Sequence, residues 1–99
     1  MQVEIQSIHF NADQKLISFI ESKLDKLKNY FNQIVRCEVI LKLEAHSQVK
    51  DKIAEVKIHL PGDLLFVKEV DKTFENSIDR AISIVVRQLK KYKDRLRNH

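Results

Sequence analysis

Basic side chains are the residues whose number and spacing in this sequence could do chemistry, and that chemistry would be the binding of a polyanion. Between Arg87 and Arg97 there are six of them and a single acid, Asp94. A helix macrodipole favours cations near its C-terminus by roughly 0.3–1 kcal/mol each, but only within the last turn. This run covers about three turns. We therefore interpret it as a surface that binds a polyanion, with a merely solvated basic face as the alternative.

The sequence shows no comparable pattern of residues for catalysis or metal binding. Cys37 alternates in phase with apolar neighbours, which indicates a small core residue rather than a nucleophile. A lone Gly62 rules out a glycine-rich phosphate loop. The four histidines fall in different segments without metal-ligand spacing: His9, His46, His59 and His99. We predict a protein that is not an enzyme and that needs no metal, cofactor or small-molecule substrate.

The overall composition indicates one folded domain of 99 residues, with 43% hydrophobic and 32% charged residues and a formal net charge of +4. A basic end suggests nucleic acid, anionic lipid or an acidic protein as partner. A single cysteine cannot form an internal disulfide, which fits a reducing compartment. The chain shows no secretory signal and no apolar run of about 18 residues. We expect a cytoplasmic protein without a membrane partner.

The last quarter, residues 71–99, predicts one long helix because it contains neither Gly nor Pro. Asp71 or Thr73 would cap it. Apolar residues in steps of three or four form its buried stripe: Phe74, Ile78, Ile82, Val85, Leu89, Tyr92 and Leu96. At about 100° per residue, four cations lie roughly opposite Ile82, namely Arg80, Arg87, Lys91 and Arg95. Three more lie on the shoulders: Lys90, Lys93 and Arg97.

A second helix is predicted to run from its N-cap Asp13, with Asn11 as the competing N-cap, to about Tyr30. Its buried stripe consists of Leu16, Ile20, Leu24, Leu27 and Phe31. One flank is basic and aromatic, without an acid: Lys15, Phe19, Lys23, Lys26 and Tyr30. The aromatic rings could simply widen the core contact while the lysines extend to solvent. The matching sign of the other helix favours a basic surface shared by both.

Four strands are predicted from alternating apolar residues, at 1–8 (ending near Ser7), 34–44, 52–60 and 64–70. Turns are predicted at 45–51 and at Pro61-Gly62-Asp63. The fourth strand is apolar on both phases, so its outer face is either partner surface or packing. The order is β-α-β-β-β-α, in the α+β class. A right-handed parallel crossover and an antiparallel meander give a four-stranded mixed sheet with two helices packed on one face.

Three segments then resemble the ribosome hibernation-promoting factor family, the ribosome-associated inhibitor or "protein Y" group. They are KLDKLKNYF (23–31), VILKLE (39–44) and SIDRAISIVVRQLKKYKDRL (77–96). The second helix of that family typically carries Ala-Ile-Asp, Arg-Gln-Leu and Lys-Tyr/His-Lys-Asp. The matching residues here are Ser77-Ile78-Asp79, Arg87-Gln88-Leu89 and Lys91-Tyr92-Lys93-Asp94. The resemblance covers nearly the whole chain.

The resemblance implies a protein that binds the small ribosomal subunit, and the whole ribosome, in the channel of messenger and transfer RNA. Bacterial family members act in stationary phase or starvation and keep idle ribosomes inactive. By analogy the contacts to ribosomal RNA are Lys23, Lys26, Arg80, Arg87, Lys90, Lys91, Lys93 and Arg95, to which we add Lys15 and Arg97 on the same predicted surface. The mechanism would be occlusion of the channel, held by phosphate contacts.

Two departures from the family pattern matter. Where the family usually has a Tyr before Ile-Asp, this chain has Thr73-Phe74-Glu75-Asn76. The sequence also lacks the second domain of long members and the extended tail of the inhibitor type. We therefore expect the short type, with residues 1–99 forming a single ribosome-binding domain that is a monomer when free and has no C-terminal dimerisation domain.

Two other functions remain open at this point. A general RNA-binding module could read double-stranded RNA by shape, with strands followed by a basic C-terminal helix. A protein-interaction domain could pair its apolar fourth strand with the edge of a partner. Binding to a plain RNA duplex would favour the first, and salt-insensitive binding to an acidic protein would favour the second.

Overall fold

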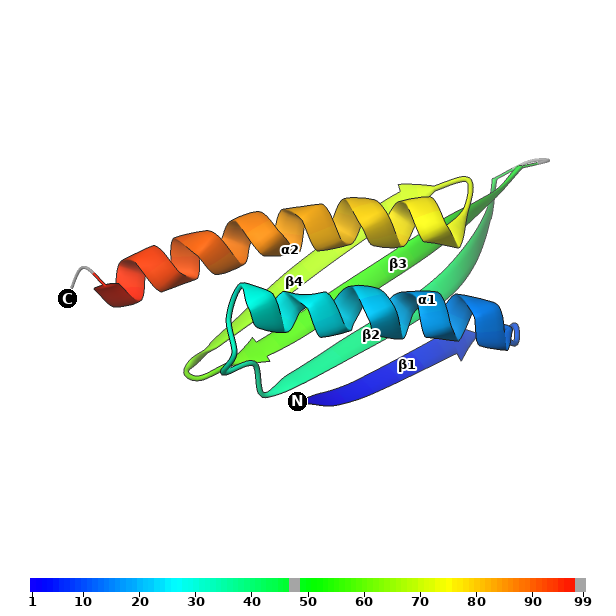
Figure 1. Ribbon diagram of the computed structural model, residues 1–99. Coiled ribbons are helices and arrows are strands. Elements are labelled where there is room, and N and C mark those ends of the chain that lie inside the picture. Colours follow the sequence, from blue (N-terminus) through cyan, green and yellow to red (C-terminus); the bar gives the residue numbers. More distant parts are fainter. Residues whose placement is uncertain (47–48, 98–99) are drawn as a thin grey trace.

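A four-stranded sheet carries both helices on one of its faces, as Figure 1 shows for the computed structural model. The structure describes residues 1–46 and 49–97. In chain order the elements are β1 (Gln2–Ile8), α1 (Gln14–Asp25), the 3-10 turn η1 (Lys26–Asn29), β2 (Arg36–His46), β3 (Val49–Leu60), β4 (Asp63–Asp71) and α2 (Phe74–Arg97). The predicted α+β fold and its β-α-β-β-β-α order are confirmed.

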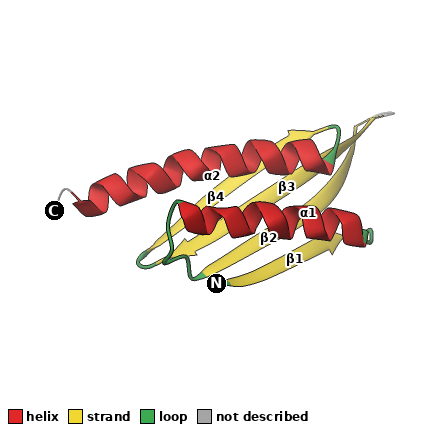
Figure 2. Ribbon diagram, in the orientation of Figure 1, coloured by secondary structure: helices red, strands yellow, loops and turns green. Residues whose placement is uncertain are grey.

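The strands lie in the order β1-β2-β3-β4, so β1 and β4 form the two edges (Figure 2). Helix α1 connects β1 to β2, and these two strands are parallel. The other neighbours are antiparallel. The register aligns Val3, Cys37, Ile58 and Leu65 in one row across all four strands. Because side chains alternate along a strand, such apolar rows all point to the face covered by the helices.

The hairpin between β2 and β3 is longer than the sequence suggested. A turn was predicted over 45–51, but Ala45 pairs with Lys50 and His46 with Val49. The middle of the predicted turn, 47–48, lies outside the described residues. Backbone hydrogen bonds between antiparallel strands form regardless of side-chain polarity, so the polar composition of this segment does not end the ladder.

The turn between β3 and β4 is where it was predicted. Gly62 has a φ of 74°, a left-handed conformation that glycine adopts without a steric penalty. The Tyr92 hydroxyl of α2 donates a 2.8 Å hydrogen bond to the carbonyl oxygen of Pro61. This bond fastens the turn to the helix layer near the C-terminal half of α2.

The two competing N-cap assignments are both settled by hydrogen bonds. The Asp13 carboxylate accepts a 2.8 Å bond from the Leu16 amide, so Asp13 rather than Asn11 caps α1. Thr73 Oγ1 accepts a 3.1 Å bond from the Asn76 amide at the start of α2. Asp71 instead accepts from the Lys72 amide, outside the helix. A side-chain oxygen at this position satisfies one of the free amides of the first turn.

The core forms where the two helix stripes meet the sheet. All five stripe residues predicted for the first helix are buried, and three of them are fully so: Ile20, Leu24 and Leu27. In α2 the buried face is shifted toward Ser77 and Ala81, which are 0% exposed. Ser77 Oγ donates to the carbonyl oxygen of Lys52 at 2.7 Å and thereby joins α2 to β3.

Two residues of the predicted α2 stripe were assigned wrongly. Ile82 is only partly buried, because the shifted face turns it toward α1. Leu96 is 53% exposed. Figure 1 gives the reason, since the last turns of α2 extend beyond the end of the sheet, where no strand lies beneath them.

Cys37 belongs to the core, as predicted, and its thiol should be inert. Its side chain is 0% exposed, and burial raises the pKa of the thiol to about 11. At pH 8 the folded protein is expected to react with a disulfide reagent about 100-fold more slowly than the urea-unfolded chain, because the thiolate is the reactive form. Absorbance of the released thiolate measures both rates. Equal rates would show an accessible thiol.

Candidate nucleic-acid interface

The basic and aromatic flank of the first helix faces the second helix. Helices α1 and α2 lie side by side on the sheet and run in the same direction (Figure 1). Lys23 Nζ lies 2.9 Å from Asp79 Oδ1 of α2. Lys90 Nζ of α2 lies 5.7 Å from the centre of the Tyr30 ring, just after η1. Lys23 and Tyr30 therefore border the gap between the helices.

The cations of α2 divide between two flanks. Three of them lie on the side of α1, which we call the interhelix flank: Lys90, Lys93 and Arg97. Lys90 lies over the Tyr30 ring, and Lys93 and Arg97 line a hollow together with Tyr30. Arg80, Lys91 and Arg95 lie on the side of β4, which we call the β4 flank. Arg80 approaches Asp71 and Arg95 approaches Asp63, each at 3.5 Å, and Lys91 lines a hollow with Leu64 and Phe66. Exposed Arg87 falls between the flanks.

This division corrects one part of the sequence-based interpretation. Arg80, Arg87, Lys91 and Arg95 were expected to join Lys15, Lys23 and Lys26 in one basic surface, provided that the corresponding flanks of the two helices meet. The rotation of α2 instead directs Arg80, Lys91 and Arg95 toward the β4 edge. The residues predicted to lie on the shoulders, Lys90, Lys93 and Arg97, are the ones that lie beside Tyr30 and the loop after η1.

The ten predicted contact residues also differ in whether they already form an ion pair with a carboxylate. Lys23, Arg80 and Arg95 have acidic partners. Within residues 1–46 and 49–97, the structure shows no ion pair for the other seven: Lys15, Lys26, Arg87, Lys90, Lys91, Lys93 and Arg97. Exposed ion pairs contribute about 0–1 kcal/mol each, so a phosphate can replace such a carboxylate. The unpaired cations offer their full charge without that exchange.

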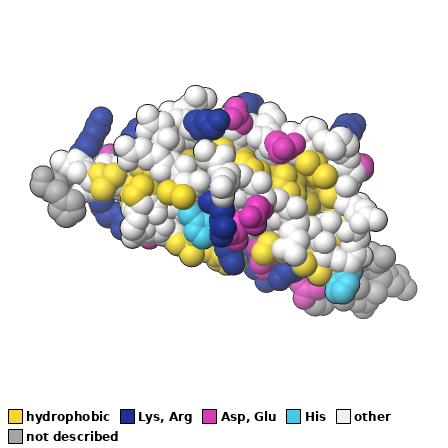
Figure 3. Space-filling model, turned by 90° about the horizontal axis from the view of Figure 1, so that it is seen from below, with side chains coloured by type: hydrophobic (Ala, Val, Ile, Leu, Met, Phe, Trp, Pro, Cys, Tyr) yellow, Lys and Arg dark blue, Asp and Glu magenta, His cyan; other side chains and the backbone are white. Residues whose placement is uncertain are grey.

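The positive charge is concentrated on the helices. Helix α2 carries seven Lys or Arg against three acids, Glu75, Asp79 and Asp94. On the face seen from the β1 edge, Lys and Arg side chains are interleaved with Asp and Glu, and apolar patches lie between them (Figure 3). The open sheet face follows the same mixed pattern, with Lys42 paired to Glu55 at 3.1 Å and His59 to Glu38 at 3.1 Å. An extended anion therefore meets the highest density of unpaired cations on the helix layer.

A shallow groove of about 330 Å³ runs between the helices. Leu27, Ile82 and Val86 form its apolar lining, and Lys23, Lys26 and Tyr30 add the polar rim. Lys15 lies apart from it, in a separate hollow at the start of both helices, together with Phe10 and Phe74. Those two rings stack with centres 5.0 Å apart. Lys15 and Lys23 of α1 and Lys26 of η1 therefore each line a hollow that the first helix segment shares with α2.

Sequence reasoning missed two features of this surface. Asp79 places a carboxylate inside the basic layer, and its contact with Lys23 could not be predicted without the distance between helices. The loop after η1 adds the amide side chains of Asn32 and Gln33 to the lining of a hollow that Lys93 and Arg97 also line. The amide-rich stretch NYFNQ at 29–33 was the available signal for this loop.

The described part of the chain contains no group of three or more His, Cys, Asp or Glu that could hold a metal ion. None of the helices within residues 1–46 and 49–97 has both the length and the apolar composition needed to span a bilayer.

Comparison with known families identifies this chain's relatives. The sequence model of the family described as "Sigma 54 modulation protein / S30EA ribosomal protein" matches residues 3–97. The chain belongs to this family. Its members are non-enzymatic, so the prediction that the protein is not an enzyme is confirmed by membership. The resemblance stated from the three sequence segments is confirmed as well.

Relatives in this family match the chain over its whole length. The "Ribosome hibernation promoting factor" of Klebsiella oxytoca is 28% identical over 99 residues, and that of Escherichia coli (strain K12) is 29% identical over 99 residues, in each case covering all of both chains. Among solved structures, the "Protein Y N-terminal domain" of Thermus thermophilus has a TM-score of 0.82 and 27% identity, covering 93% of this chain and 99% of its own. A "ribosomal subunit interface protein" from Coxiella burnetii shares the fold. Its TM-score is 0.83 and its identity 19%, covering 95% of this chain and 99% of its own.

Proposed function

We propose that this protein is a ribosome hibernation factor. It binds the small ribosomal subunit through the basic surface of its two helices and blocks the channel for messenger and transfer RNA. Translation is then inhibited in stationary phase or starvation. The observation that supports this most directly is the gathering of basic side chains from both helices on one side of the sheet, in a family whose relatives carry the name hibernation promoting factor.

The proposed mechanism is occlusion and involves no reaction. A folded domain fills space that messenger and transfer RNA need, and contacts from Lys and Arg to phosphate hold it there. We assign the larger share of these contacts to the interhelix flank with Lys23 and Lys26, and to Arg87. Lysine and arginine contacts to phosphate give affinity and position with little readout of sequence, which suits binding to a fixed site of folded RNA.

We further propose that residues 1–99 act as one ribosome-binding domain, monomeric when free and located in the cytoplasm. One continuous core, to which both helices and the sheet contribute, supports the single domain. The β4 edge exposes Leu64 and Phe66, at 49% and 50%, which is the feature behind the alternative of a protein-interaction domain. Lys91 and Arg95 lie beside these residues. The protein-interaction alternative should therefore be tested with a partner segment that is both acidic and apolar.

The experiment that tests the proposal is co-sedimentation of the purified protein with small subunits and whole ribosomes on sucrose gradients, at low and high salt. Binding is expected at low salt, with a loss of affinity as salt rises, because each phosphate contact releases counterions. Excess transfer RNA is expected to displace the protein. Binding that transfer RNA leaves unchanged would contradict occlusion of the channel.

A plain RNA duplex is the control in the same assay. Equal affinity for the duplex and for the small subunit would favour the general RNA-binding module, which reads A-form geometry. An acidic protein that binds independently of salt would instead favour the protein-interaction domain.

A further inference from the structure

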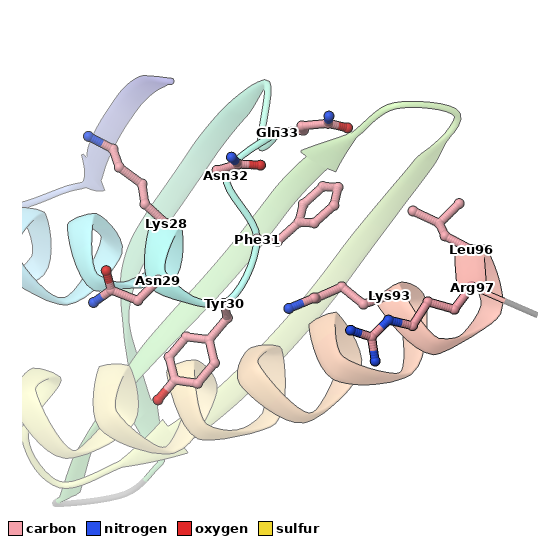
Figure 4. A pocket seen from close by; sticks show the side chains of 9 residues that line it. All are labelled: Lys28, Asn29, Tyr30, Phe31, Asn32, Gln33, Lys93, Leu96 and Arg97. Carbon is pink, nitrogen blue, oxygen red and sulfur yellow. The ribbon is translucent and has the colours of Figure 1, made fainter.

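A hollow of about 490 Å³ lies where the loop after η1 approaches the last turns of α2, and Figure 4 shows it from close by. Its lining combines an aromatic ring, two amides, two cations and an apolar side chain: Tyr30, Asn32, Gln33, Lys93, Arg97 and Leu96. None of the loop residues was among the predicted contacts. We propose that this hollow binds one unpaired nucleotide of a single-stranded RNA. The proposal deepens the proposed function, on which it rests, by naming the form of RNA that this end of the surface takes.

The cations provide the phosphate contact. Lys93 projects from α2 toward the loop and the Arg97 side chain runs back along α2 toward Lys93, whereas Lys28 and Asn29 at the margin of the hollow point away from both (Figure 4). Lys93 and Arg97 have no hydrogen bond or ion pair with any residue in the described ranges. They are four residues apart on one helix, so both charges face the same side. A phosphate bridging them would stand at the outer rim of the hollow.

Tyr30, at the margin of the hollow with its ring turned toward α2 and away from Asn32 and Gln33, provides the stacking surface (Figure 4). Its side chain is 37% exposed, which is high for an aromatic ring between two helices, and Lys90 Nζ already stands over one face. The neighbouring Phe31 is buried and packs edge-on against Tyr92, with ring centres 5.2 Å apart, so the backbone that carries Tyr30 is anchored in the core. Because the ring is already anchored, stacking a base on it costs the protein little further conformational entropy. Leu96, at 53% exposure, offers an apolar contact across the hollow.

Asn32 and Gln33 provide the groups that distinguish a base from a plain phosphate chain. Both are exposed, and their amides have no hydrogen bond to any other residue that the structure describes. A carboxamide offers a donor and an acceptor side by side, which matches the edge of a nucleobase. Such an edge is accessible only in an unpaired nucleotide, because pairing occupies it in a duplex. These groups therefore favour single-stranded RNA over a helix.

The test uses the absence of tryptophan from this sequence. Tyr30→Trp places a single indole at the margin of the hollow, and a base that stacks on it should quench its fluorescence. A single-stranded RNA octamer is expected to quench it saturably, whereas an abasic octamer of the same charge and a blunt duplex are not. Equal quenching and equal affinity for the abasic RNA would overturn the proposal, because only the phosphates would then be bound.

Substitutions measure how much each group contributes. Tyr30→Ala is expected to lower the affinity for the octamer by about 5- to 150-fold, the range for loss of one stacked base, while Tyr30→Phe keeps it. Asn32→Ala with Gln33→Ala should also weaken binding. The matched pair Asn76→Ala with Gln88→Ala, which removes two amides of α2 outside the hollow, should not. Circular dichroism and thermal melting establish that each variant is folded. Equal effects of the two amide pairs would contradict the assignment.

Ribosome co-sedimentation of the unsubstituted protein separates this inference from the proposed function. Binding to ribosomes together with identical affinity for octamer and abasic RNA would refute the nucleotide site alone. Quenching by the octamer without any binding to ribosomes would refute the proposed function and leave the site standing.

Discussion

Replacing Lys90, Lys93 and Arg97 together with Gln is expected to weaken binding to the small subunit by about 100-fold at ~0.15 M salt. The estimate counts three lost phosphate contacts, each of which no longer releases its counterions. The slope of log K against log[salt] should become shallower by about 2 to 3 for the same reason. Co-sedimentation at four or more salt concentrations measures both quantities, and an unchanged melting temperature confirms that the variant is folded.

The matched control is the triple variant of the β4 flank, Arg80→Gln, Lys91→Gln and Arg95→Gln. Each triple lowers the formal net charge from +4 to +1, so both reduce long-range attraction to RNA equally. The control should lose less than about tenfold, because Arg80 and Arg95 already lie beside Asp71 and Asp63 and face away from the first helix. Equal losses would mean that net charge decides binding. A larger loss in the control would move the interface to the β4 flank.

Leu89→Ala and Leu96→Ala should differ widely in their effect on stability although they change the same residue type on the same helix. Leu89 is 0% exposed, and its truncation is expected to lower the free energy of unfolding by about 2–5 kcal/mol, from lost burial and the cavity that remains. Leu96 is 53% exposed, so its truncation should cost within about 0.5 kcal/mol. Urea denaturation followed by circular dichroism gives both values.

The comparison is informative because both leucines lie on the apolar stripe predicted from sequence. A loss of more than about 2 kcal/mol in Leu96→Ala would contradict the exposed position of that side chain beyond the sheet. Unchanged stability in Leu89→Ala would contradict the packing of α2 on the sheet. Since a domain of this size has a total stability of about 5–15 kcal/mol, the Leu89 variant should also melt at a visibly lower temperature.

Local physics determined the elements themselves. Residues spaced by three or four along a segment share one face of a helix, so Leu16, Ile20 and Leu24 could be assigned to the core without knowing their partner. Alternation in 34–44 and 52–60 likewise identified the face of the sheet that holds Cys37 and Ile58. An N-cap side chain bonds to a backbone amide about three residues further along the chain. The sequence therefore left two candidate N-caps for each helix.

Long-range contacts decided what these local rules leave open. The polar stretch at 45–51 does not end the hairpin, because ladder hydrogen bonds depend on the backbone of the opposite strand. The apolar stripe of the second helix continues to Leu96, yet burial requires a surface underneath, and the sheet ends first. Neither outcome depends on any property of the residue alone.

The composition of the second helix was sufficient to predict a basic surface, and the resemblance of three segments was sufficient to name its family. Which cations stand beside the first helix was decided only by tertiary structure. Small Ser77 and Ala81 allow α2 to pack closely against the sheet on their side, and this packing sets the rotation of the whole helix. A helix is nearly rigid, so that rotation directs Lys90, Lys93 and Arg97 toward Tyr30 and the loop while Arg80, Lys91 and Arg95 turn to the β4 edge.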